Sequence, residues 1–140
     1  LNFSQKNNHK ISDFWKPIRA KKKHLTICPK EFFILKSKQK IRVPKNMAAE
    51  MIPYDTSLGD FRVHYAGFFD PGFGDPNGSF AVMEVRTNEV PFNLEDGQNI
   101  ARLVYEKLNK PTKVAYGSNI NSNYQNQGLA LSKHFNIKSK

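Results

Sequence analysis

The stretch DPGFGDPNGSFAVMEVRT, residues 70–87, decides the class of fold that we expect. Its first nine residues contain three glycines and two prolines, a density that is typical of a long structured turn. Residues 79–87 follow as a largely apolar run, which we interpret as a β-strand. The stretch therefore predicts a turn that leads directly into a strand.

The segments around this stretch also have the pattern of short strands separated by turns. Apolar and polar residues alternate at 25–27, 33–35 and 41–43, as they do in half-buried strands. Further strands are expected at 60–66, 98–106 and 112–116, with turns at 29–31, 36–38 and 95–97. Only residues 47–51 hint at a helix, and that helix is too short to change the class. The pattern predicts an all-β barrel or sandwich.

Length and composition suit one domain with flanking segments. The chain has 140 residues, of which 39% are apolar, and this is enough for a core. Because its apolar runs are short and Leu1–Lys6 is polar, we expect neither a membrane helix nor a secretory signal. We divide the chain into an irregular arm (1–23), a β domain (24–116) and a polar tail (117–140). The only tryptophan, Trp15, is expected to pin the arm to the domain. The missing initiator Met leads us to expect a piece of a longer protein.

The positive charge is concentrated in the first third of the chain. The net charge is +10, but residues 1–46 contain 13 Lys/Arg and 2 Asp/Glu, whereas residues 47–140 contain 9 and 10. A protein that wraps nucleic acid usually spreads its positive charge over the binding surface. We therefore interpret the basic run at 19–24 as a solvated segment and do not expect a nucleic-acid partner. An RNA-contacting arm and a helper for an anionic ligand are the alternatives.

Cysteine and histidine are too sparse for the usual zinc sites. The single Cys28 excludes an internal disulfide, and the four histidines have no paired ligand spacing. Zinc-dependent base deaminases need a His-x-Glu and a Pro-Cys-x-x-Cys, and neither occurs here. We interpret Cys28 as a small apolar residue at a buried strand end and place the protein in a reducing cytoplasm.

Two carboxylates, those of Glu84 and Asp70, can be interpreted either as functional groups or as structural ones. Glu84 interrupts the apolar run 80–85, where a charge loses hydration and needs partners or a cleft. A carboxyl buried there could both accept and donate a proton near neutral pH. The alternative is an outward charge that protects an edge strand. Asp70 precedes a proline, so it is either a turn starter or part of a site.

Four blocks follow one another along the second half of the chain: VHYAGFFDPGF (63–73), FAVMEV (80–85), LEDGQNIARL (94–103), and Tyr116 with YQNQG (124–128). Together they resemble the deoxycytidine triphosphate (dCTP) deaminases, relatives of the trimeric deoxyuridine triphosphatases (dUTPases). The resemblance implies a distorted jelly-roll or β-clip barrel of the dUTPase-like type at 24–116 and a nucleotide-covering tail at 117–140. It also implies a hydrolase that acts on the C–N bond of a cyclic amidine, converting dCTP to dUTP and ammonia in pyrimidine deoxynucleotide metabolism.

More narrowly, FWKP (14–17) and the stretch from Tyr54 to Phe73 resemble the second half of the long, two-domain bacterial form. Single-domain members carry an Arg-Ser-Ser-x-x-Arg motif that holds phosphate and the attacking water. The matching stretch here, DTSLGD (55–60), has Asp55 and Asp60 in place of both arginines. Arg62 is a candidate substitute. We expect a missing N-terminal half or a neighbouring subunit to supply the arginines, and the lone chain to be inactive.

The resemblance assigns a role to each candidate residue. Glu84 is the catalytic base, which moves the protons of the reaction without zinc. The candidate substrate-binding residues are Ala66 through its main chain, Asp70 near the deoxyribose hydroxyl, Tyr116, Tyr124 and Gln127 over the sugar and phosphates, and Ser57 and Arg62 from the phosphate-binding stretch. Magnesium is expected to be held by the triphosphate itself rather than by a protein cage.

The expected partners are a deoxynucleoside triphosphate and other copies of the chain in a trimer, with no membrane. Three rival functions stay open. The first is a dUTP diphosphatase, in which Asp70 aims water at phosphorus. The second is a non-catalytic nucleotide-binding or structural half. The third is a nucleic-acid module, which predicts binding that weakens steeply with salt.

Overall fold

The computed structural model describes residues 1–20, 23–53, 61–64, 67–118, 122, 124–126, 128–129 and 131–136, and only the backbone of residues 53 and 61–64. This part of the chain is all-β, as predicted, with one short 3₁₀ helix. The elements are η1 (Ile11–Asp13), β1 (His24–Ile27), β2 (Phe33–Ile41), β3 (Met47–Pro53), β4 (Phe61–His64), β5 (Phe68–Phe69), β6 (Ser79–Thr87), β7 (Phe92–Glu95) and β8 (Ala101–Lys107). No helix among these residues is long and apolar enough to cross a membrane.

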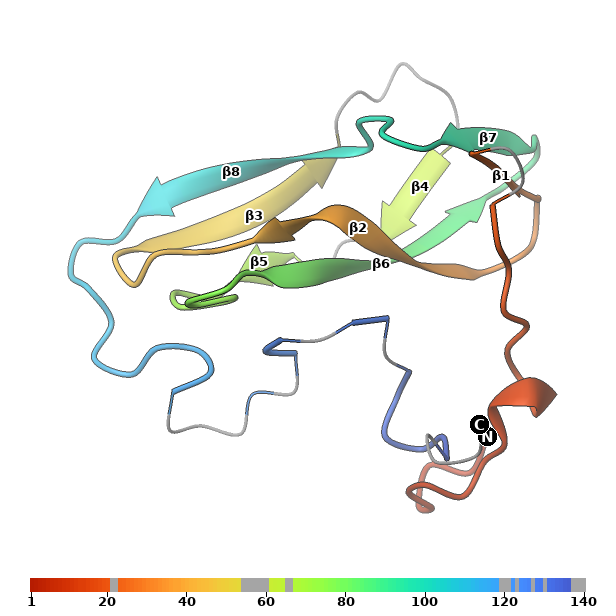
Figure 1. Ribbon diagram of the computed structural model, residues 1–140, viewed down its shortest axis with the longest axis horizontal. Helices are drawn as coiled ribbons and strands as arrows, with labels where there is room; N and C mark the ends of the chain where they lie inside the picture. Colours follow the sequence, from red (N-terminus) through yellow and green to blue (C-terminus); the bar gives the residue numbers. More distant parts are fainter. Residues whose placement is uncertain are drawn as a thin grey trace.

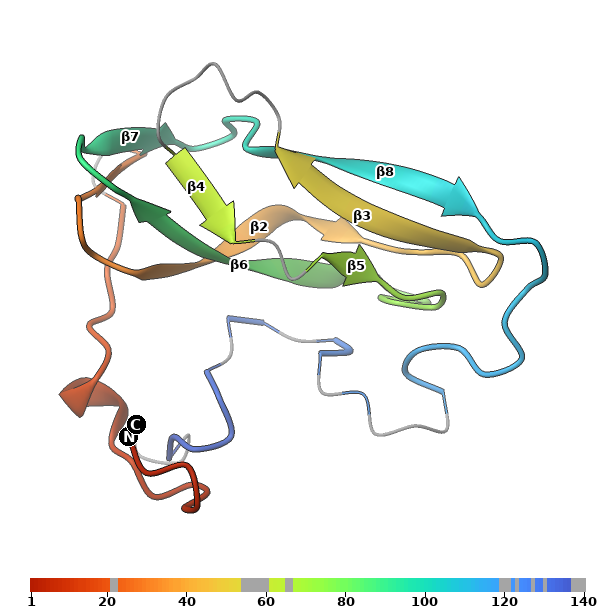
Figure 2. The same ribbon diagram turned by 180° about the vertical axis from the view of Figure 1, so that it is seen from behind.

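The strands form three small antiparallel sheets, ordered β2-β6-β4, β5-β3-β8 and β1-β7 (Figures 1 and 2). Strand β6 pairs with β2 on one side and β4 on the other, so it is the central strand of its sheet. Strand β3 is central in the second sheet and pairs with β8 along its whole length, from Met47 opposite Lys107 to Pro53 opposite Ala101. The glycine-rich turn 70–78 connects β5 of the second sheet to β6 of the first.

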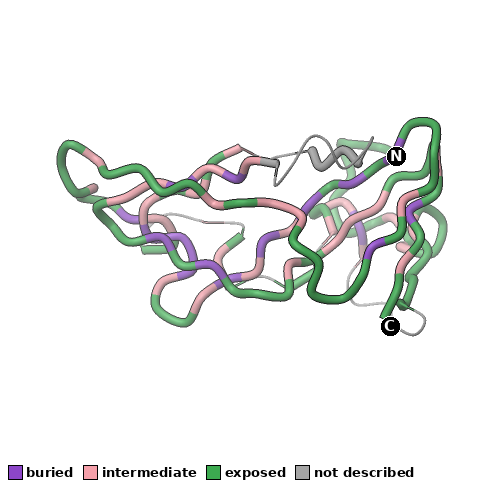
Figure 3. Tube along the Cα trace, turned by 90° about the horizontal axis from the view of Figure 1, so that it is seen from above, coloured by how far each residue is buried: buried purple, intermediate pink, exposed green. Residues whose placement is uncertain are grey.

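The side chains of β6 alternate strictly between the core and the outside. Every odd-numbered residue from Ser79 to Thr87 is buried, whereas the even-numbered residues are half-buried or exposed. Figure 3 shows how buried, half-buried and exposed residues follow one another along the chain. The period of two follows from the pleat of a strand, which sends successive side chains to opposite faces. It therefore separates the apolar core from the face that carries Glu84.

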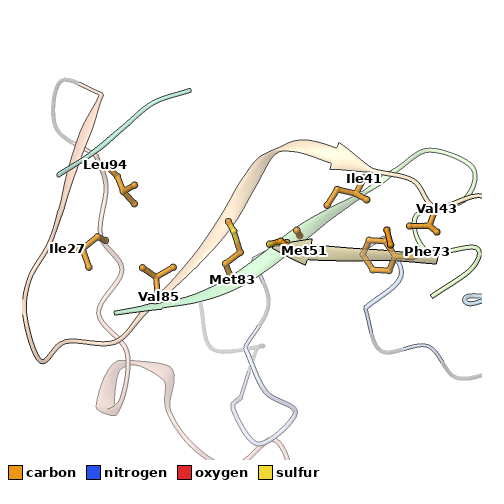
Figure 4. Close-up of a cluster of buried hydrophobic side chains, with 10 residues drawn as sticks. Ile27, Ile41, Val43, Met51, Phe73, Met83, Val85 and Leu94 are labelled. Atoms are coloured by element: carbon orange, nitrogen blue, oxygen red, sulfur yellow. The ribbon is translucent and has the colours of Figure 1, made fainter. Parts of the chain in front are cut away.

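The core is one continuous row of apolar side chains between the sheets (Figure 4). It begins with Ile27 of β1 and Leu94 of β7, and it ends with Val43 and Phe73. Between them lie Val85, Met83, Met51 and Ile41, from strands β6, β3 and β2. Because these residues come from distant parts of the sequence, the core ties the three sheets into one unit.

Several local expectations were wrong. Residues 47–51, which hinted at a helix, belong to β3, because pairing with β8 outweighs the local preference of a short segment. The expected turn at 36–38 lies inside β2, at a register shift opposite β6. There the hydroxyl of Ser37 accepts a hydrogen bond from the Ala81 backbone (3.0 Å), which satisfies a ladder donor without a turn. Residues 112–116 form no strand, and β5 and β7 were not expected.

The expected burial of Cys28 was also wrong, because its side chain is exposed. The residue directly follows Ile27, which is fully buried at the end of β1. Alternation along the chain turns the next side chain outward.

The close approach of the 70–78 turn to β2 requires glycine at position 74. Gly74 has a φ of +74°, and a Cβ at this position would overlap the carbonyl oxygen of Ile41. We expect Gly74→Ala to lower the free energy of unfolding by about 3 kcal/mol, from the positive φ and the forced shift together. The matched control is Gly97→Ala, where φ is also positive (+90°) but no atom lies within 4 Å of the added Cβ. Denaturant unfolding that shows equal losses for both variants would exclude the steric explanation.

Candidate active site

Glu84 lies in the middle of β6 and points away from the core. Its side chain is exposed, so the expectation of a buried carboxyl was wrong for this chain by itself. The outer face of β6 carries apolar side chains because it is half-buried in its first half, at Phe80 and Val82. The strand is not enclosed on both faces. The alternative of an outward charge on an edge strand is right in the outward direction and wrong in the edge position, because β6 pairs on both sides. An exposed carboxylate in the middle of a central strand needs a different explanation.

The outer face around Glu84 combines apolar side chains with cations. Ile34, Phe80 and Val82 are half-buried there, and Ile34 is the register partner of Glu84 on β2. The ammonium of Lys36 lies 4.2 Å from the centre of the Phe80 ring, and the guanidinium of Arg86 lies 5.2 Å from that of Phe32. These cation–π contacts hold two positive charges on the strands that carry and flank Glu84.

Strand β4 brings two further residues beside Glu84 by register. His64 is the backbone partner of Glu84, and Arg62 is the partner of Arg86. Directly opposed residues of an antiparallel pair are cross-strand neighbours. The position of Arg62 therefore suits the phosphate-binding role expected for it, although that role stays a prediction.

A cavity of the described chain lies on the opposite side of β6. It has a volume of about 400 Å³, and Leu25, Leu35, Met51 and Met83 contribute to its apolar wall. Neither Glu84, Asp70, Tyr116 nor Tyr124 lines it. This cavity is therefore not the cleft that was expected beside Glu84, Ala66 and Asp70, and that cleft stays a prediction.

A second group of candidate residues gathers at the turn 70–78. Asp70 is exposed at the start of this turn, and the backbone carbonyl of Pro71 accepts a hydrogen bond from the Tyr116 backbone (2.8 Å). Burial raises the pKa of the Tyr116 phenol, the hydrogen bond from the Tyr124 backbone lowers it in part, and the nearby charge of Asp70 raises it further. The phenol therefore stays neutral well above physiological pH and is available as a hydrogen-bond donor.

The tail folds back over this turn. The Tyr116 hydroxyl accepts a hydrogen bond from the Tyr124 backbone (3.1 Å), and the Ser79 hydroxyl donates one to the Tyr124 carbonyl (3.3 Å). Gln125 makes three further bonds: it accepts one from the Gly74 backbone (2.9 Å) and donates to the carbonyls of Asp75 (3.0 Å) and Gly72 (3.4 Å). The Tyr116 hydroxyl thus lies at the Tyr124 backbone and near Asp70, while the expected role of these residues over the nucleotide stays a prediction. The sequence analysis missed Gln125, since one amide in an Asn- and Gln-rich tail carries no distinctive signal.

The amide of Gln125 is expected to hold the tail on the turn. We expect Gln125→Ala to raise the hydrogen-exchange rate of the Gly74 amide at least tenfold, because each lost hydrogen bond contributes about 1 kcal/mol. The control is Gln98→Ala, which removes a comparable bond to the Glu95 backbone (3.0 Å) at a different turn. Unchanged protection of Gly74 in the Gln125 variant would contradict this role.

Three candidate residues, Ala66, Ser57 and Gln127, lie outside the described residues, as do Asp55 and Asp60. The others form two groups, with Glu84 and Arg62 on the first sheet and Asp70, Tyr116 and Tyr124 at the turn. Asp70 follows His64, the register partner of Glu84, by six residues. The Cα atoms of His64 and Asp70 are therefore at most about 20 Å apart. Among the described residues, no group of three or more His, Cys, Asp or Glu side chains is arranged to hold a metal ion.

Comparisons with known proteins identify the family of the chain. Residues 1–135 match the family model described as the C-terminal domain of 2′-deoxycytidine 5′-triphosphate deaminase (DCD). Two curated proteins named "dCTP deaminase, dUMP-forming" are similar: one from Halobacterium salinarum is 32% identical over 102 residues, and one from Methanobrevibacter smithii is 30% identical over 105. These alignments cover 71% and 72% of this chain and 50% and 52% of the relatives.

A solved structure is more similar in sequence. The crystal structure of 2′-deoxycytidine 5′-triphosphate deaminase from Agrobacterium tumefaciens is 53% identical, with a TM-score of 0.68. The match covers 75% of this chain and 32% of that chain. This chain thus spans about half the length of the curated relatives and a third of the crystallised one. Because the family model covers 135 of its 140 residues, the chain belongs to the DCD C-terminal domain family and has the dUTPase-like β fold.

Proposed function

We propose that this chain carries the proton-transferring residue of an enzyme that deaminates dCTP to dUTP and ammonia. The observation that carries the proposal is Glu84: a carboxylate at the centre of an open, half-apolar sheet face, with Arg86 nearby and Arg62 and His64 adjacent by register. A surface carboxylate that is only solvated does not require apolar and cationic side chains around it. A cytosine ring, by contrast, needs apolar contact on its faces and a carboxyl beside N3 and C4.

The proposed chemistry uses one carboxyl for every proton transfer. Water attacks C4 of cytosine while the Glu84 carboxylate removes a proton from it and passes this proton to N3. In the tetrahedral intermediate, Glu84 takes the proton of the new hydroxyl and delivers it to the exocyclic nitrogen. The C4–N bond then breaks, ammonia leaves, and the N3 proton remains in the uracil product. Cytosine and water are consumed, and Glu84 returns to its carboxylate form.

Two observations support a site that this chain shares with another one. Glu84 is exposed, whereas proton shuttling of this kind needs a site from which bulk water is excluded. The second observation comes from the sequence, in which Asp55 and Asp60 replace the expected phosphate-binding arginines. We propose that an N-terminal half or a neighbouring subunit covers this face and supplies the missing arginines, in a trimeric enzyme of the cytoplasm. We call this chain together with that N-terminal half the complete protein.

Magnesium enters the proposal only with the substrate. A triphosphate binds Mg²⁺ through its own oxygens, and the ion usually keeps several waters, so a protein cage is not required. Zinc has no part in the proposed steps, because Glu84 alone performs the proton transfers.

A second candidate function is suggested by the names of the relatives. Both curated relatives are called dUMP-forming, which implies cleavage of the triphosphate after deamination. The 53% identical structure is described only as a deaminase, and this favours dUTP as the product here. An ammonia assay and phosphorus NMR of the complete protein, with dCTP and separately with dUTP, distinguish the possibilities. The proposal expects ammonia and dUTP; dUMP with pyrophosphate indicates the bifunctional enzyme; dUTP cleavage without ammonia from dCTP indicates a diphosphatase that uses Asp70.

A further inference from the structure

The cavity on the far side of β6 opens along a seam between two strand edges. Strand β2 lies at the edge of its sheet and β8 at the edge of the other, and among the described elements each pairs on one side only. Both strands contribute to the lining, together with the segment 96–100 that leads from β7 to β8. The cavity therefore reaches from a mouth at this seam into the core between the sheets.

Two cross-links bridge the seam. At the mouth, the Lys38 ammonium of β2 donates hydrogen bonds to both carboxylate oxygens of Asp96 (3.0 and 2.9 Å). Beyond the lining, the Tyr105 hydroxyl of β8 donates one to the carbonyl of Arg42, directly after β2 (3.2 Å). A further strand that paired with both edges would have to displace these links, whereas a small molecule would not. The seam therefore favours a ligand of limited size.

The inner wall of the cavity is aliphatic. Met51 of β3 and Met83 of β6, in the middle of the apolar row in Figure 4, contribute to this wall, as do Leu35 and Ile41 of β2. Among the described residues, no aromatic side chain belongs to the lining. The volume of about 400 Å³ is in the range of small-molecule sites. Because the wall is apolar, flexible at its methionines and without stacking partners, it suits an aliphatic chain.

The charged residues of the lining have an excess of cations. They are the carboxylates of Glu95 and Asp96 and the cations of Lys23, Lys36, Lys38 and Arg102. The Lys36 ammonium lies over the Phe80 ring on the other face of the sheet, which leaves three cations against two carboxylates. Asp96 is already paired with Lys38, which lowers the pKa of this carboxyl and keeps it ionised. The remaining positive charge attracts a ligand with an anionic end.

The N-terminal arm brings Lys23 to the mouth. The backbone carbonyl of Lys23 accepts a hydrogen bond from the Asp96 backbone (2.9 Å), and Ala20 lines the cavity as well. The ring centre of Trp15 lies 6.0 Å from that of Phe32, directly before β2, which confirms that Trp15 joins the arm to the domain. Part of the basic run 19–24 thus lies beside an apolar cavity, where it can serve an anionic ligand.

We propose that this cavity binds a linear aliphatic carboxylate, with its chain beside Met51 and Met83 and its carboxylate near Lys23. A neutral chain gains the apolar contacts but not the attraction to the mouth, and a short anion gains only that attraction. The site is independent of the proposed deaminase chemistry, because it lies on the side of β6 opposite Glu84.

The test adds sodium decanoate to the complete protein, whose methionine methyl groups carry ¹³C for NMR. This chain has three methionines, and Met47 does not line the cavity, so it is an internal control. We expect saturable shifts of the Met51 and Met83 methyl signals and none of the Met47 signal. Octanoate should bind about tenfold more weakly, because it buries two fewer methylenes. Acetate should cause no shift.

The variant Lys23→Glu tests the anionic end of the ligand. Its matched control is Lys113→Glu, since Lys113 is also exposed but lies outside the lining. We expect Lys23→Glu to weaken the binding of decanoate about fivefold and to leave the binding of decanol unchanged, because only decanoate carries a charge. Lys113→Glu should bind both probes like the unmodified protein.

The absence of saturable shifts in the complete protein would overturn the inference, because another part of the protein then fills or closes the cavity. Joint shifts of all three methionines would also overturn it, since they indicate unfolding by a surfactant rather than binding at one site. Equal losses of decanoate affinity in the two lysine variants would refute the role of the mouth. Ammonia release from dCTP does not enter this test, so the proposed function is decided separately.

Discussion

Replacing Glu84 with glutamine is expected to lower kcat for ammonia release from dCTP by about 10²- to 10⁴-fold, the usual contribution of a general acid–base residue. Glutamine has nearly the same size but cannot take a proton from water or return one to the leaving amine. Since the Glu84 side chain is exposed, the substitution should change the free energy of unfolding by less than about 0.5 kcal/mol. An ammonia assay and thermal unfolding of the complete protein check the two parts separately.

The control for this variant is Glu106→Gln. Glu106 is also an exposed strand carboxylate, but it lies on β8, opposite Ala48. Its replacement should leave both kcat and the melting temperature unchanged. If the Glu84 variant turns over dCTP as fast as the Glu106 variant does, Glu84 is not the catalytic base.

The second large effect concerns the chain by itself. We expect the isolated 140-residue chain to release no measurable ammonia from dCTP, at least 10³-fold below the complete protein. Without its partner the Glu84 face remains open to water, and Asp55 and Asp60 repel a triphosphate. The open Glu84 face impairs proton transfer, whereas the two aspartates impair substrate binding. Because these are separate requirements, the two losses of activity should multiply.

The measurement is a dCTP assay of the lone chain, of the N-terminal half of the complete protein, and of a mixture of the two. Activity should appear only in the mixture. Analytical ultracentrifugation of the same samples shows whether association accompanies activity. A monomeric lone chain with full turnover would contradict a shared site.

The sequence predicted the fold wherever a local pattern coincided with a packing requirement. The period of two in β6 and the glycine-rich turn before it are both present, because each satisfies its own geometry locally. The helical hint at residues 47–51 was wrong because Ala48 and Ala49 have no strand preference, and only the pairing with β8 makes them a strand. The bulge at Ser37 is equally non-local, since its hydroxyl serves a backbone donor on another strand.

The candidate site shows the same difference between local features, which the sequence predicts, and non-local ones, which it does not. The resemblance suggested Glu84, Tyr116 and Tyr124 as site residues, and the structure places the Tyr124 backbone at the Tyr116 hydroxyl. Their roles at the nucleotide stay predictions. The burial of Glu84 could not be predicted, because an apolar run does not tell whether the outer face of a strand meets its own chain or another. Gln125 acts through backbone groups that are 50 to 53 residues away, so nothing near it in the sequence marks it.

The most direct test of the proposed role of Glu84 measures binding and chemistry in the same sample. The complete protein and its Glu84→Gln variant are each mixed with a substoichiometric amount of dCTP labelled with ¹⁵N on the exocyclic amine, and the reaction is stopped after a single turnover. We predict that both proteins bind the nucleotide with similar affinity, and that only the unmodified protein releases labelled ammonia. Labelled ammonia from the variant at the rate of the unmodified protein would contradict the proposal that Glu84 moves the protons.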